Sequence, residues 1–123
     1  MRFWDSSALV SLLVAEADTP RRLAQLRDDP VLALWWSTPV ECESAMQRRV
    51  REGALDAVAA RSARARLADL AGSAHEVPPS AALRTLALRL LRTHPLRAAD
   101  ALQLAAAVTL AAALRRQDRS DGP

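Results

Sequence analysis

The sequence is poor in cysteine, in aromatic residues and in long apolar runs. Cys42 is the one cysteine among 123 residues, which excludes an intramolecular disulfide and, with it, a small disulfide-stapled secreted fold. No apolar run approaches the roughly 20 residues that a membrane-spanning helix needs. An acid, Asp5, stands where a signal peptide requires apolar residues. We therefore expect a cytoplasmic protein that has no membrane association.

Lysine is absent as well, together with isoleucine, asparagine and tyrosine, so all 17 basic residues are arginine. Such usage is typical of a GC-rich genome, and the arginine count alone says little about partners. The formal net charge is only +3, which permits a nucleic-acid partner without requiring one. Because 50% of the residues are hydrophobic and 25% are charged, we expect one compact domain with a real core.

Short apolar runs alternate with segments that carry helix-capping signals. Capping residues are expected at 37–39 and at Ser80, and Gly53 is expected to end a helix. Strands are predicted at 2–4, 31–35 and 76–77, and helices at 8–15, 21–27, 40–52, 55–70, 81–92 and 96–115. This alternation predicts an α/β fold with a short parallel sheet. We expect the domain to cover residues 1–116, with a polar, disordered tail over 117–123.

Three acids stand out because of where they fall in this pattern. Asp5 follows the first predicted strand, Glu41 lies in the first turn of a helix, and Asp100 lies near the start of an otherwise apolar helix. Ligand sites of open α/β sheets gather at the ends of strands and the starts of helices. Carboxylates that converge there suit Mg²⁺ or Mn²⁺, which would activate a water and neutralise charge on a phosphodiester.

Each of these acids has a second interpretation. An acid in a first helical turn also stabilises the helix dipole, by about 0.3–1 kcal/mol. Glu43 is the reserve candidate if the register differs, and otherwise a solvated residue. Ser7 could support a carboxylate, although N-capping explains it equally well. Cys42 has no histidine nearby in sequence, so a nucleophilic role is not predicted.

Three segments resemble the motifs of PIN-domain ribonucleases, in the same order and at similar separations. They are residues 3–9 (FWDSSAL), residues 38–46 (TPVECESAM) and residues 96–105 (LRAADALQLA), of which the last is the most specific. The resemblance covers about residues 1–115. The short length and the segment VECESA look most like VapC-type toxins of bacterial toxin–antitoxin modules.

This resemblance implies a three-layer α/β/α sandwich and a Mg²⁺- or Mn²⁺-dependent endoribonuclease acting on RNA. It implies that Asp5, Glu41 and Asp100 are the catalytic residues and metal ligands, with Ser7 as a supporting polar contact. Proteins of this kind are typically homodimers that a cognate antitoxin holds inactive. Arginines near the cleft would meet RNA phosphates, although the sequence does not assign which ones.

The chain departs from the family pattern at its end. The family usually continues into a further strand, sometimes with a fourth acid, whereas residues 114–123 carry no strand signal. We therefore expect the C-terminal strand to be missing. One alternative is a catalytically impaired PIN-fold remnant that acts only in antitoxin or subunit binding. Another is a helical RNA- or partner-binding module, in which the three acids would lie far apart.

Overall fold

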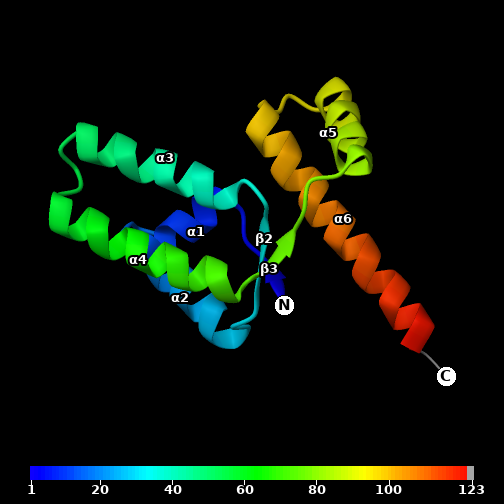
Figure 1. The fold of residues 1–123 in the computed structure, drawn as a ribbon, viewed down its shortest axis with the longest axis horizontal. Helices are drawn as coiled ribbons and strands as arrows, with labels where there is room; N and C mark the ends of the chain where they lie inside the picture. Colours follow the sequence, from blue (N-terminus) through cyan, green and yellow to red (C-terminus); the bar gives the residue numbers. More distant parts are fainter. Residues whose placement is uncertain (122–123) are drawn as a thin grey trace. The chain divides into compact units, whose positions relative to one another are not determined.

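The computed structural model describes residues 1–121 and contains two compact units. The boundary between them along the chain falls between Glu76 and Val77. The first unit holds two strands and four helices, followed by most of a third strand, in the order shown in Figure 1. These elements are β1 (Arg2–Phe3), α1 (Ser6–Leu13), α2 (Thr19–Asp28), β2 (Leu32–Trp35), α3 (Thr38–Arg51), α4 (Ala57–Ser73) and β3 (His75–Val77). The second unit holds the two helices α5 (Ala81–Thr93) and α6 (Ala98–Asp121).

The three strands form one small sheet in the order β1-β2-β3. Strands β1 and β2 are parallel, with Arg2 opposite Leu32 and Phe3 opposite Ala33. Their carboxyl ends therefore meet at the same edge of the sheet, where the chain enters α1 and α3. The prediction of an α/β fold with a short parallel sheet is confirmed, and the predicted strands differ from the observed ones by only one residue at an end.

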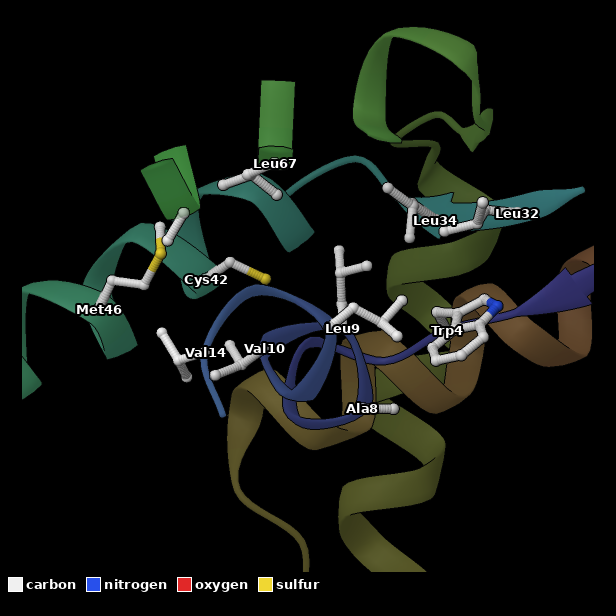
Figure 2. Packing of buried hydrophobic residues seen from close by; sticks show 12 residues of the cluster. Trp4, Ala8, Leu9, Val10, Val14, Leu32, Leu34, Cys42, Met46 and Leu67 are labelled. Carbon is white, nitrogen blue, oxygen red and sulfur yellow. The ribbon is translucent and has the colours of Figure 1, made fainter. Parts of the chain in front are cut away.

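Helix α1 is central to the first unit, because it packs against α2, α3 and α4. Its Leu9 side chain is fully buried and belongs to a cluster that also holds Trp4, Cys42 and Met46. Figure 2 shows Leu9 in this cluster, with Trp4 on one side and Cys42 on the other. Burial of such large apolar side chains is the main favourable term in folding. The starts of α1 and α3 are therefore anchored on a shared core.

Helices α3 and α4 form an antiparallel hairpin and lie side by side (Figure 1). The turn between them contains Gly53, which adopts a φ of +75°. Glycine reaches this left-handed conformation without the steric cost that a Cβ brings, which is why it ends helices so often. The prediction that the helix stops at Gly53 is confirmed.

The second unit is a helix pair in which α5 packs against α6. The hydroxyl of Ser80 accepts a hydrogen bond from the backbone N–H of Leu83 at 3.1 Å, so it caps α5 as predicted. Helix α6 runs to the end of the described part of the chain, and residues 98–121 contain no strand. Whether residues 1–116 form a single domain remains a prediction.

The end of α6 differs from the prediction of a disordered tail over 117–123. The helix continues through residues 117–121, while residues 122–123 lie outside the described part of the chain. No glycine or proline interrupts the sequence between Pro95 and Gly122, and Arg115 and Asp118 have the i, i+3 spacing that stabilises a helix surface. The lack of glycine and proline thus outweighs the polarity on which the disorder prediction was based.

By length and composition α6 is also long and apolar enough to cross a membrane. This was not expected, because the apolar residues of α6 are interrupted by Gln103 and Thr109. Core helices of soluble proteins meet the same criterion.

Candidate functional site

Asp5 lies just beyond the carboxyl end of β1 and is the N-cap of α1. Its Oδ1 accepts a hydrogen bond from the backbone N–H of Ala8 at 2.8 Å. This bond satisfies one of the unpaired donors of the first helical turn. The side chain is exposed, and among residues 1–121 no donor reaches its second oxygen, Oδ2. The cap therefore fixes the orientation of Asp5 and leaves Oδ2 accessible to a ligand.

Glu41 projects from the first turn of α3, four residues after Ser37. The Ser37 hydroxyl donates to Glu41 Oε2 at 2.7 Å, and the Ser6 hydroxyl donates to Oε1 at 3.3 Å. One of these serines follows β1 and the other follows β2, so both come from the same edge of the sheet. Each oxygen of the half-buried carboxylate thus receives a hydroxyl from a different element.

Cys42 lies fully buried behind the two carboxylates. Burial, together with the negative charges of Glu41 and Asp5, raises the pKa of its thiol to about 12. Its Sγ–H points to the backbone oxygen of Ser6 at 3.8 Å. The thiol is therefore protonated at neutral pH, which agrees with the prediction that it is no nucleophile. The carboxylates of Asp5 and Glu41 both lie near this thiol.

Asp100 belongs to the second unit, where it lies exposed in the first turn of α6. Asp5 and Glu41 belong to the first unit. Within residues 1–121 no three His, Cys, Asp or Glu side chains form a ready-made metal cluster. The structure therefore brings Asp5 and Glu41 to one edge of the sheet, while the convergence of all three acids remains a prediction.

Glu43 is occupied elsewhere on α3. Its Oε1 accepts a hydrogen bond from Gln47 at 3.0 Å and lies 3.3 Å from Nε of Arg64 on α4. Glu43 thus links α3 to α4 at the surface of the helical hairpin. This arrangement favours Glu41 over its reserve candidate.

The serines that hold Glu41 were not among the predicted site residues. Ser6 provides the hydroxyl, whereas its neighbour Ser7 is exposed and its supporting role remains a prediction. Ser37 was predicted to cap α3, but its side chain makes no cap hydrogen bond to the backbone and donates to Glu41 instead. The i, i+4 spacing of Ser37 and Glu41 is the sequence signal that could have identified this contact.

The donor set suits a hard divalent cation. Mg²⁺ is commonly held by one or two carboxylates, with water and substrate phosphate completing its coordination. Asp5 and Glu41 provide two such carboxylates at the start of neighbouring helices. The thiol beside them is buried and protonated, so it does not compete as a ligand. These residues therefore fit Mg²⁺ or Mn²⁺ better than a metal that prefers thiolate or imidazole.

Comparison with known proteins gives one match. The model of the PIN domain family matches residues 2–119 of the chain. No curated protein matches. The matched region includes Asp5, Glu41 and Asp100, together with both units of the structure.

Proposed function

The chain belongs to the PIN domain family, and on that premise we propose that it is a metal-dependent endoribonuclease that hydrolyses RNA phosphodiester bonds. PIN domains have a nuclease-type fold and are generally metal-dependent nucleases. In this proposal Asp5, Glu41 and Asp100 hold Mg²⁺ or Mn²⁺, and all three lie close together in the active protein. A divalent ion held there supplies charge neutralisation at the scissile phosphodiester.

The observation that supports this function best is the pair of hydroxyls on Glu41. Ser37 and Ser6 each donate to one oxygen of its carboxylate, and such hydrogen bonds hold a carboxylate in one orientation. The N–H of Ala8 does the same for Asp5. Such outer contacts fix ligand geometry in metal sites, because an unsupported side chain loses rotamer entropy on binding.

The test is cleavage of a single-stranded RNA by the full chain, with Mn²⁺ or Mg²⁺ and with a chelator. We expect Asp5→Asn and Glu41→Gln each to lower the cleavage rate by on the order of 100-fold or more. Asparagine is also a good N-cap, so Asp5→Asn keeps α1 intact. The matched control is Glu43→Gln on the same helix, which removes the same charge outside the site and should cleave normally. Equal cleavage by all four proteins, or cleavage that persists in the chelator, would overturn the proposal.

We further propose the role of a VapC-type toxin that acts as a cytoplasmic homodimer and is held inactive by a cognate antitoxin. Support comes from the segment VECESA. Expression of the chain in a bacterium should then arrest growth, and Glu41→Gln should relieve the arrest while the protein accumulates to the same level. Arrest that Glu41→Gln leaves unchanged would contradict a toxin that acts through this site.

The catalytically impaired remnant is the second candidate function. It is favoured by α6, which is helical over residues 117–121, where the family resemblance predicts a further strand. Such a protein would bind antitoxin or a second subunit and would cleave no RNA with any divalent ion. The cleavage assay above separates the two functions, since only the enzyme shows a loss on Glu41→Gln.

A further inference from the structure

A pocket of about 220 Å³ opens between α1 and α3 in the first unit. Five of its seven lining residues carry polar or charged side chains. The lining consists of Ser6, Ser7, Val10, Glu16, Ala45, Arg48 and Arg49. Since the Ser6 hydroxyl also donates to Glu41 Oε1, the pocket adjoins the candidate metal centre. A ligand seated in it would therefore lie beside the carboxylate of Glu41.

The guanidinium of Arg49 already has partners within the wall of the pocket. Its guanidinium forms an ion pair with Glu16 and donates to the backbone oxygen of Ala45 at 3.2 Å. The other oxygen of Glu16 accepts the hydroxyl of the buried Ser11 at 2.9 Å. This network neutralises Glu16, so its charge does not repel an anion in the pocket.

Arg48 differs from Arg49 in its contacts. Its side chain is exposed, and within residues 1–121 its guanidinium makes no ion pair and no side-chain hydrogen bond. With two arginines and one glutamate, the lining has a formal excess of one positive charge. A guanidinium presents planar donors that match phosphate oxygens, and the hydroxyl of Ser7 adds a further donor. The pocket thus has the chemistry of an anion site.

The position of Arg48 on α3 relates this site to Glu41. The two residues are seven positions apart, which places them on one face of the helix and roughly 10 Å apart along its axis. Ala45, with a small side chain, lies between them on that face. A strand whose scissile phosphate meets Glu41 can therefore place another of its phosphates at Arg48.

We propose that this pocket is a phosphate-binding subsite for single-stranded RNA, in which Arg48 contacts the backbone and Arg49, fixed by Glu16, shapes the wall. This inference rests on the proposed function for the choice of RNA as the ligand. The contact is to the backbone, so it increases affinity for RNA of any sequence.

The experiment measures binding of a fluorescent single-stranded RNA to the full chain in a chelator, over a range of salt concentrations. Each phosphate contact to a single strand contributes about 0.7 to the slope of log K against log salt. Arg48→Ala should therefore reduce the slope by about 0.7 and weaken binding to RNAs of different sequence alike. Arg48→Lys keeps the charge and should restore most of the slope. Because Arg48 is exposed, circular dichroism and thermal unfolding should be unchanged in both variants.

The matched control is Arg51→Ala, which removes the same charge from the same helix two residues beyond Arg49, the last residue that lines the pocket. Equal losses in Arg48→Ala and Arg51→Ala would mean that only bulk charge matters and would overturn the subsite. The absence of RNA binding by the parent chain would also overturn it. So would binding of a polyglutamate peptide that depends on Arg48 when RNA binding does not, because the pocket would then be a protein-docking site.

The outcome is independent of the cleavage assay. If Arg48→Ala lowers the slope but the parent chain never cleaves RNA, the subsite stands and the nuclease function fails. If Asp5→Asn abolishes cleavage while Arg48→Ala binds RNA normally, the nuclease function stands and the subsite fails.

Discussion

The two units of the molecule differ in the size of the side chains that they bury. The first unit encloses Trp4 from the segment after β1, Leu9 from α1 and Met46 from α3. The second unit encloses mainly alanines of a single helix pair, such as Ala101 and Ala105 of α6. Apolar area buried sets the hydrophobic contribution to stability, so the first unit has the larger internal source of stability.

The same difference extends to the acids that each unit carries. Asp5 and Glu41 accept hydrogen bonds from donors whose own positions are fixed by the core of the first unit. Asp100 lies exposed in a first helical turn, where the helix dipole supplies its electrostatic support. A carboxylate can thus be held in one orientation by hydrogen bonds from a packed core, or it can extend from the exposed surface of a helix. Only the first arrangement preorganises a site.

The largest effect that tests this comparison is a cavity in the first core. Leu9→Ala should lower the free energy of unfolding by about 3–5 kcal/mol, because the side chain is fully buried among large neighbours. Leu83→Ala removes a leucine of similar burial from the second unit, whose buried side chains are smaller on the whole, and should cost about 2–3 kcal/mol. Urea unfolding followed by circular dichroism measures both values.

Leu88→Ala is the control for the loss of leucine itself, since Leu88 is about half exposed at 49%. It should change stability by less than about 0.5 kcal/mol. A cost for Leu83→Ala that equals or exceeds that of Leu9→Ala would remove the proposed difference between the units.

The next effect concerns Asp100, the acid of the second unit. Asp100→Asn should lower RNA cleavage by on the order of 100-fold if Asp100 is a metal ligand, and it should change stability by no more than about 1 kcal/mol, the contribution of an acid to the helix dipole. Asp118→Asn, which removes the same charge far along α6, should cleave RNA normally. Measured rates that are equal for both variants would reduce Asp100 to its helix-dipole role and leave a two-carboxylate site.

The sequence predicted the elements of both units well, because their signals are local. Periodicity and capping residues identified all three strands and all six helices, and Gly53 and Ser80 were placed correctly at helix ends. The helical end of α6 was not predicted, although its signal is local as well. The prediction gave too much weight to the polar composition, although no glycine or proline lies between Pro95 and Gly122.

The candidate site was less predictable, because its contacts join residues far apart in the chain. Asp5 and Glu41 were found from their places at element starts, but the contact of Ser6 with Glu41 spans 35 positions. The pocket beside them depends on the packing of α1 against α3, and no local pattern distinguishes Arg48 from the other arginines. Such contacts follow from tertiary packing, which composition and periodicity do not encode locally.

The smallest effect tests whether the scaffold of the first unit tunes its metal site. Ser37→Ala removes the hydroxyl 2.7 Å from Glu41 Oε2 and should weaken Mn²⁺ binding by roughly 10-fold, because outer contacts orient a ligand without replacing it. Titration calorimetry measures this affinity without any cleavage. Ser37→Thr retains a hydroxyl and should recover most of the affinity, whereas Ser44→Ala, on an exposed position of α3, should leave it unchanged. If Ser37→Ala binds Mn²⁺ as tightly as the parent chain, the Ser37 hydroxyl is not needed to orient Glu41. The proposed difference between the preorganised carboxylate of Glu41 and the exposed carboxylate of Asp100 would then disappear.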